Sequence, residues 1–158
     1  MDVTVRTATR DDVPVIVRLL ADDALGAQRE LLEDPVASVY LQAFDEMASQ
    51  PGNDLLVAER DDKVIGCLQL TIISGLSRRG ARRAQIEGVR VSSSHRGEKV
   101  GEQLVLAAIA RARARGCGLV QLTSDVSRLD ARRFYERFGF KATHIGMKLT
   151  LTKGTSEP

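Results

Sequence analysis

One segment in the second half of the chain constrains the fold most, because a strand pattern leads through a short polar loop into a long helix pattern. Residues 84–91 have the composition of a strand, and residues 92–97 form the polar loop. The helix begins near Lys99 and ends at Gly116. Its apolar face consists of Val100, Leu104, Val105, Ala108, Ile109 and Ala112. A short apolar strand pattern follows at residues 119–123, so strand and helix alternate as they do in α/β proteins.

The remaining apolar patterns indicate further strands and helices. Strands are expected at residues 3–8, 55–59 and 64–70, with a last strand or strand pair over 141–152. Helices are expected after the capping sequence Thr9–Asp12, from Asp34-Pro35 to Gln50, and over 129–138. Residues Arg60–Lys63 are typical of a hairpin turn between two of these strands. The order of elements predicts an α/β (α+β) fold with a mixed central sheet of about six or seven strands, flanked by about four helices.

Length and composition narrow the class of protein. The 158 residues fit a single domain over residues 1–158, with a loose tail at 152–158. Lys and Arg number 23 and Asp and Glu number 21, and the net charge of +2 is too mild to indicate a polyanionic partner. The chain has no run of about 18 apolar residues and no signal-peptide core, so we expect a soluble, cytoplasmic protein without a membrane partner. Two cysteines and two histidines without ligand spacing predict no metal site.

The loop Arg96–Gly101 opens directly into the long helix and is the first candidate site. Successive backbone N–H groups and the positive helix end converge there, and such a terminus binds phosphate or pyrophosphate. Gly97 and Gly101 let ligand oxygens approach the backbone. The patterns G-x-x-x-x-G-K-S/T and G-x-G-x-x-G are both absent. Taken alone, these residues fit a solvated loop with an ordinary helix cap equally well.

Two side chains are candidates for acid–base chemistry. Glu87 lies within a strand beside Gly88, which leaves space for a ligand, and a desolvated carboxylate here would be basic enough to act on a cationic substrate. Alternatively, Glu87 faces water or pairs with an arginine of the loop at residues 74–83. Tyr135 fits the core by its spacing between two phenylalanines, but its phenol could also serve as an acid toward a leaving group.

Together these segments resemble the GNAT superfamily of acyl-CoA-dependent N-acetyltransferases, and the resemblance covers almost the whole chain. It is strongest at Glu87–Gly101 and at Ala131–Phe140, which is close to the family pattern A-x-x-F-Y-E-x-x-G-F. In the family's phosphate-loop pattern R/Q-x-x-G-x-G/A, Arg96 and Gly101 match, whereas Lys99 stands where the middle glycine is expected.

The resemblance implies transfer of an acetyl group from the cosubstrate acetyl-CoA directly to a primary amine of a small molecule. Glu87 would be the general base, directly or through water, and Tyr135 the general acid beside the CoA sulfur. The main chain of Val89, Arg90 and Val91 would pair with the pantetheine arm at a splayed strand edge. The backbone N–H groups that would hold the pyrophosphate belong to Arg96, Gly97, Glu98, Lys99, Val100, Gly101 and Glu102, and Arg128 would contact the cofactor.

Other functions compete with this one. A protein or peptide N-acetyltransferase would have an open groove, and a non-catalytic acyl-CoA-binding module would bind CoA without turnover. Nucleic-acid binding is not expected, because none of the two Tyr and four Phe lies among the loop arginines as a stacking platform. The loop arginines are Arg78, Arg79, Arg82 and Arg83, which could bind a substrate carboxylate or phosphate or could be solvated. The acceptor, the acyl group and the oligomeric state, including a homodimer, stay open.

Overall fold

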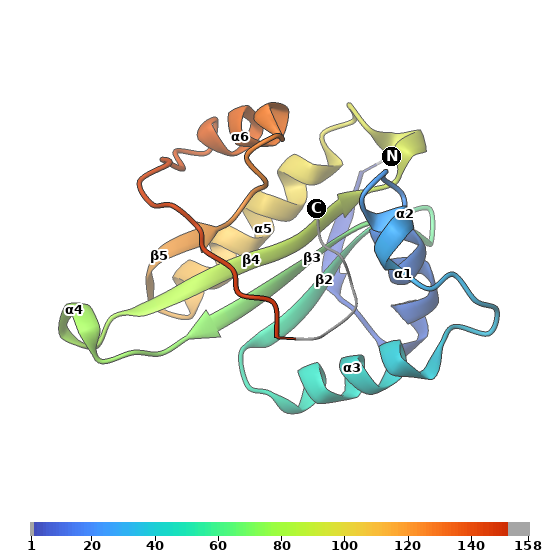
Figure 1. The fold of residues 1–158 in the computed structure, drawn as a ribbon, viewed down its shortest axis with the longest axis horizontal. Helices are drawn as coiled ribbons and strands as arrows, with labels where there is room; N and C mark the ends of the chain where they lie inside the picture. The colour runs from blue at the N-terminus through green and yellow to red at the C-terminus, as the bar shows by residue number, and fades with distance from the viewer. Residues whose placement is uncertain (1, 152–158) are drawn as a thin grey trace. The chain divides into compact units, whose positions relative to one another are not determined.

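A mixed five-stranded sheet forms the centre of the first part of the chain, residues 1–122 (Figure 1). The computed structural model describes residues 2–151 of the 158. The strands lie in the order β1 (Thr4–Thr7), β2 (Asn53–Arg60), β3 (Lys63–Ile73), β4 (Arg82–Val91) and β5 (Cys117–Leu122). Neighbouring strands are antiparallel except β4 and β5, which are parallel and are connected through helix α5 (Val100–Ala114).

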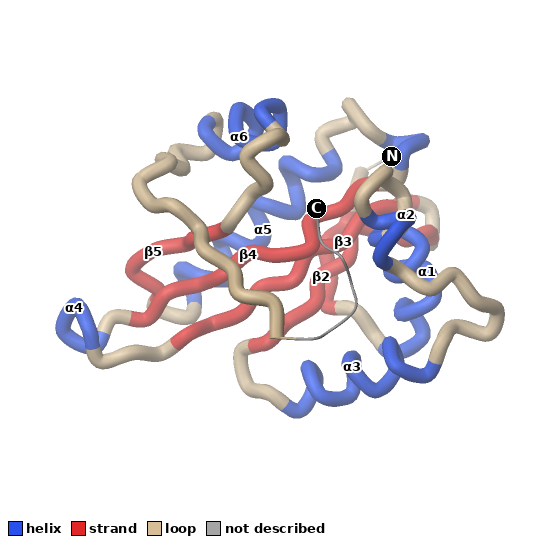
Figure 2. The backbone as a smooth tube through the Cα atoms, viewed as in Figure 1, coloured by secondary structure: helices blue, strands red, loops and turns tan. Residues whose placement is uncertain are grey.

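Four helices of eight or more residues occur within residues 2–151, in agreement with the apolar patterns (Figure 2). They are α1 (Val13–Leu20), α3 (Ser38–Ser49), α5 and α6 (Leu129–Glu136); the shorter turns are α2 (Gly26–Arg29), α4 (Ser77–Gly80), η1 (Arg10–Asp12) and η2 (Ser93–His95). The mixed α/β fold class is therefore confirmed. None of these helices is long and apolar enough to cross a bilayer.

The chain divides into two units, residues 1–122 and residues 123–158. Helix α6 belongs to the second unit. That residues 1–158 form a single domain stays a prediction, and the predicted tail at 152–158 lies outside the described residues.

Helices pack against both faces of the sheet in the first unit. Successive residues of a strand point to opposite faces, so neighbouring residues of β3 contact different helices. On one face of β3, Cys67 packs with Ile16 and Leu19 of α1 in a buried cluster. On the other face, a Cβ added to Gly66 would lie 3.1 Å from Cδ1 of Leu104, so α5 approaches the sheet closely at this glycine. The largest fully buried side chains include Leu56, Leu68, Leu70, Ile86 and Leu104.

A two-residue turn closes the β2–β3 hairpin, as the sequence Arg60–Lys63 predicts. Arg60 pairs with Lys63, and Asp61 and Asp62 between them have φ values of 51° and 59°. Positive φ at both central residues defines a type I′ turn, whose twist matches that of the flanking strands. Aspartate adopts this backbone conformation more readily than most residues, so the local sequence determines this turn.

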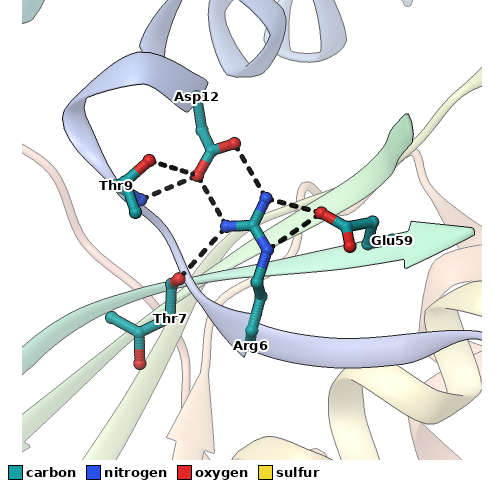
Figure 3. Close-up of polar contacts among 5 residues, drawn as sticks. All are labelled: Arg6, Thr7, Thr9, Asp12 and Glu59. Atoms are coloured by element: carbon teal, nitrogen blue, oxygen red, sulfur yellow. Dashed lines mark hydrogen bonds and ion pairs between the residues drawn. The ribbon is translucent and has the colours of Figure 1, made fainter. Parts of the chain in front are cut away.

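An ionic cluster fixes the start of α1 against the sheet (Figure 3). The guanidinium of Arg6 in β1 donates to both carboxylate oxygens of Asp12, at 2.7 and 3.0 Å, and to Glu59 of β2. Asp12 also accepts a hydrogen bond of 2.7 Å from the backbone N–H of Thr9, which confirms the predicted capping sequence. The hydrogen bonds from Arg6 lower the pKa of Asp12 to about 2, against the opposing effect of burial.

The strand or strand pair predicted over residues 141–152 is wrong for residues 141–151, which form neither strand nor helix. The apolar residues of this segment do alternate, but they are 84–94% exposed; they are Ile145, Met147, Leu149 and Leu151. Alternation alone does not make a strand, because a strand needs a hydrogen-bonded neighbour. The sheet within residues 2–151 therefore has five strands instead of six or seven, and residue 152 lies outside the described part.

Two helix boundaries also differ from the prediction. Helix α3 begins at Ser38, later than the predicted start at Asp34-Pro35, because the backbone of Ala37 is extended. Helix α6 ends at Glu136, and the N–H of Phe138 closes a turn onto the carbonyl of Tyr135 instead of continuing the helix.

Candidate active site

Strand β4 is paired along both edges only in its first half. Its last pair with β5 joins Ile86 to Leu122, whereas its pairing with β3 continues to Val91. Residues 87–91 therefore have one edge without a neighbouring strand among the described residues. This is the edge at which the family resemblance implies a splayed strand.

The backbone of β4 presents donors to this open edge. The N–H of Ser92 donates to the carbonyl of Ile65 and therefore points toward β3. Successive N–H groups of a strand alternate in direction, and the N–H of Val91 therefore points toward the open edge. An extended ligand could pair with the main chain there as a further strand would.

A β-bulge at Gly88 shapes the start of the open half. Glu87 pairs with Gln69 and Arg90 pairs with Cys67, so Gly88 and Val89 together oppose a single residue of β3. Gly88 has φ +59°, which favours glycine. A Cβ at this position would meet only Cδ2 of Leu20 at 3.8 Å, an ordinary contact. The glycine is therefore required by its backbone conformation more than by the space that the sequence suggested.

Glu87 is the first residue beyond the last β4–β5 pair, and its side chain is exposed. The desolvation considered from the sequence is therefore not observed. No hydrogen bond or ion pair involves this side chain among residues 2–151, so it does not pair with the loop arginines either. An unpaired carboxylate at this point is available to a cationic ligand.

Five residues on from Val91, the chain enters the predicted phosphate loop at Arg96. Lys99 is the N-cap of α5 and has φ 62° and ψ 12°, in the left-handed region. This region favours glycine, which explains why the family pattern has glycine there, and the loop adopts the conformation in spite of the lysine. The first bond to Lys99 comes from the N–H of Gln103. The N–H groups of residues 100–102 therefore have no backbone acceptor in the described chain and can bind an anion.

Long-range contacts to Asp22 and to Arg60 hold this loop, and the contacts to Asp22 include an ion pair of 3.9 Å with Arg96. The guanidinium of Arg96 donates to the backbone carbonyl of Asp22 at 2.6 Å, and the Asp22 carboxylate accepts from the N–H of Ser93 at 2.6 Å. Arg60, at the β2–β3 turn, donates to Glu98 and lowers the pKa of that carboxyl. The predicted loop residues Arg96 and Glu98 thus have protein partners that neutralise part of their charge.

Cys67 lies in the sheet directly behind the bulge and is 1% exposed. Burial raises the pKa of its thiol to about 12. Because the thiolate is the nucleophilic form, a thiol that keeps its proton is unsuited to covalent catalysis.

Two predicted residues belong to the second unit. Tyr135 is half-buried, and its ring packs edge-to-face against Phe134 and Phe140, with centroids 5.1 and 5.8 Å apart. The aromatic spacing of α6 therefore forms a small apolar cluster. Arg128 is the N-cap of α6; it is exposed and lines a shallow depression at the start of that helix.

Comparison with known proteins identifies the family of this chain. The sequence model of the acetyltransferase (GNAT) family matches residues 18–140, more than half of the chain. The chain belongs to the GNAT acetyltransferase family. The resemblance stated from the sequence is confirmed, and the chain is an enzyme of the acyltransferase class.

Several relatives of this acetyltransferase cover most of its length. Aminoalkylphosphonate N-acetyltransferase from Salmonella typhimurium is 28% identical over 141 residues, which is 89% of this chain and 86% of that protein. A crystal structure described as a transcriptional regulator from Bacillus halodurans is 47% identical, with a TM-score of 0.92 over 95% of this chain and all of that one. A putative acetyltransferase from Agrobacterium tumefaciens is 26% identical, with a TM-score of 0.81 over 93% of this chain and 99% of that one.

Sequence reasoning located the open half of β4 and the helix start of this acetyltransferase, but it missed their partners. Asp22 lies 74 residues before Arg96, and Arg60 lies 38 residues before Glu98. Asp23 forms an ion pair of 3.2 Å with Arg90 in the same way. No local pattern marks such contacts, because they exist only once the sheet has formed.

Proposed function

We propose that this enzyme transfers an acetyl group from acetyl-CoA directly to a primary amine of a small molecule. The observation that carries the proposal is the position of Glu87 at the point where β4 loses its partner β5. A carboxylate, an open main-chain edge and the free N–H groups of a helix start thus follow one another along one segment.

The cosubstrate would bind along this segment. The pyrophosphate would accept hydrogen bonds from the N–H groups of residues 96–102, where the helix dipole also favours negative charge. The pantetheine arm would pair with the main chain of Val89, Arg90 and Val91. Arg128 would supply a further cationic contact to the cofactor.

Glu87 would act as the general base. An alkylammonium has a pKa near 10, so at neutral pH its proton must be removed before the nitrogen can attack a thioester. Glu87 would take this proton directly or through a water molecule. The free amine would then attack the thioester carbonyl, and a backbone N–H near Val89 would stabilise the tetrahedral oxyanion.

Tyr135 would act as the general acid. As the carbon–sulfur bond of the intermediate breaks, the phenol would protonate the departing CoA thiolate. The products would be the N-acetylated amine and free CoA. The half-buried position of Tyr135 in an aromatic cluster supports a phenol in a partly apolar environment.

A small acceptor is favoured over a protein. The Salmonella relative is named for a small amine that carries a phosphonate. A protein or peptide acceptor and a non-catalytic acyl-CoA-binding role stay as alternatives. A cytoplasmic location, a homodimer, and the absence of metal, nucleic-acid and membrane partners stay predictions.

The test is calorimetric titration with acetyl-CoA, followed by thiol-release assays with small amines and with peptides. We expect micromolar binding in the parent protein and its loss in a Gly101→Glu variant, which places a carboxylate at the start of α5. Turnover with peptides alone would favour the protein acetyltransferase, and binding without turnover would favour the binding module. Absence of binding in the parent protein would overturn the proposal.

A further inference from the structure

The face of β4 that points away from α5 carries a line of polar side chains. Arg83, Gln85 and Glu87 alternate with Ala84 and Ile86, which are 0% and 2% exposed on the opposite face. Because strand residues alternate, the three polar side chains lie on one face of the sheet. Their charges run from cationic through neutral to anionic along the strand.

The neighbouring strands extend this polar surface. In register, Gln69 of β3 pairs with Glu87, and Gln121 of β5 pairs with Gln85. The side-chain amide of Gln121 donates to the Gln85 oxygen at 2.7 Å, and the amide of Gln69 donates to Asn53 of β2 at 2.9 Å. We refer to Arg83, Gln85, Glu87, Gln69 and Gln121 as the polar strip. The amides of Gln85 and Gln121 are bonded to each other and the amide of Gln69 is bonded to Asn53, whereas the charged side chains of Arg83 and Glu87 have no such bond within residues 2–151.

Neither charged residue of the polar strip has an ion pair or side-chain hydrogen bond among residues 2–151. The adjacent Arg82 differs, because its guanidinium donates to the carbonyl of Arg115 at 2.6 Å. The Arg83 guanidinium instead lies beside the backbone of Gly75, where an added Cβ would be 3.8 Å from Nη1. Arg83 and Glu87 are four residues apart, or about 13 Å between Cα atoms. Because the side chains of Arg83 and Glu87 both extend from the strand, the space between the guanidinium and the carboxylate can be spanned by a small molecule.

We propose that the polar strip binds the acceptor and that Arg83 selects amines that carry an anionic group. This rests on the proposed function, because the amine end must meet Glu87. A guanidinium recognises phosphonate, phosphate or carboxylate oxygens through two parallel hydrogen bonds. The amide of Gln85 provides a neutral donor and acceptor between the two ends, and the amide of Gln69 lies beside Glu87 in register. The substrate class is thus a short amine with an anion at its far end.

The test compares three acceptors of similar length with saturating acetyl-CoA: 2-aminoethylphosphonate, 3-aminopropanoate and n-propylamine. In the parent enzyme, we expect kcat/KM to be highest for one of the two anionic amines. A higher value for 2-aminoethylphosphonate would indicate preference for a tetrahedral anion, and a higher value for 3-aminopropanoate would indicate preference for a carboxylate. In Arg83→Gln, we expect the ratio of kcat/KM for the preferred anionic amine to that for propylamine to fall about 10- to 100-fold, mainly through KM. Arg83→Lys keeps the charge but loses the two-pronged geometry, so its ratio should be intermediate.

The matched control is Arg79→Gln, which removes the same charge from the exposed β3–β4 connection and should leave the ratio unchanged. Equal ratios in the parent and Arg83→Gln, or an equal loss in Arg79→Gln, would overturn the role of Arg83. A parent enzyme that acetylates all three amines equally would overturn the substrate class alone. A parent enzyme that acetylates no amine would overturn the proposed function as well. Thermal melting of each variant ensures that only folded enzyme is compared.

Discussion

Arginine and carboxylate side chains occur in two contrasting arrangements on this sheet. At the corner of β1 and α1, Arg6 bonds both Asp12 and Glu59 at 2.6 to 3.0 Å (Figure 3). On the polar strip, Arg83 and Glu87 share a face but have no partner within residues 2–151. Opposite charges that are already paired stabilise the fold, whereas opposite charges held apart remain available to a ligand. The first arrangement predicts effects on stability and the second predicts effects on catalysis.

The largest expected effect is on turnover and concerns the unpaired charges of the polar strip. Glu87→Gln should lower kcat/KM about 10²- to 10⁴-fold, because the glutamine amide cannot accept the amine proton. Acetyl-CoA affinity and the free energy of unfolding should stay within about 0.5 kcal/mol of the parent values, since the exposed side chain has no partner. Steady-state thiol release, titration calorimetry and urea unfolding measure these three quantities.

Glu46→Gln is the matched control for this variant, because Glu46 is exposed on α3 and its side chain has no partner among residues 2–151. It should alter none of the three quantities. Unchanged turnover in Glu87→Gln would exclude Glu87 as the general base.

The next largest effect is on the free energy of unfolding and concerns the ionic cluster of Arg6, Asp12 and Glu59. Arg6→Gln should reduce the free energy of unfolding by roughly 2–3 kcal/mol, because it leaves the poorly exposed Asp12 carboxylate without its main partner. Arg18→Gln, on an exposed position of α1, should change it by less than about 0.5 kcal/mol. Urea unfolding compares them, and equal stability in the two variants would show that the cluster does not anchor the helix.

The same cluster makes stability depend on acidity. The pKa of Asp12 is about 2 in the folded chain and 3.8 ordinarily, so the unfolded chain binds the proton more readily. The contribution, about 2 kcal/mol, is complete above about pH 5 and is lost as the pH falls through 2. Asp12→Asn should lack this component, so unfolding free energies measured from pH 5 to pH 2 should converge. Parallel curves for the parent and the variant would contradict the assignment.

The smallest expected effect tests whether the left-handed backbone conformation of Lys99 lowers the free energy of unfolding. Lys99→Gly should raise the free energy of unfolding by about 1 kcal/mol, because glycine adopts a φ of 62° without the steric cost of a Cβ. Lys99→Ala keeps the Cβ and should give no gain. Thermal denaturation of both variants checks this, and equal melting temperatures would indicate that the lysine conformation is not strained.

Local features of the fold could be predicted, and features that depend on a distant partner could not. The hairpin at Arg60–Lys63 and the helix start near Lys99 follow from turn residues and apolar spacing within a few positions. The alternation at Ile145–Leu151 also predicts a strand, but the pattern does not indicate whether a neighbouring strand is available for pairing. The count of strands was wrong for this reason.

The candidate site divides in the same way. Glu87 and the loop at Arg96–Gly101 were proposed from the sequence, because the family motifs and the helix-start pattern each lie within one continuous segment. The bulge at Gly88 was not, because a glycine inside a strand signals spare room and unusual backbone conformation equally well. Register with β3, set by residues about twenty positions away, decides between these two readings.

The burial of Cys67 makes this thiol an internal reporter of unfolding. It lies at 1% exposure in the sheet centre with its pKa near 12, so an alkylating reagent can reach it only when the strands separate. With the half-buried Cys117 replaced by serine, the labelling rate of the remaining thiol would measure how often the native sheet opens. One reagent would thereby follow, in the absence of denaturant, whether ligands that occupy the open half of β4 hold the whole sheet closed.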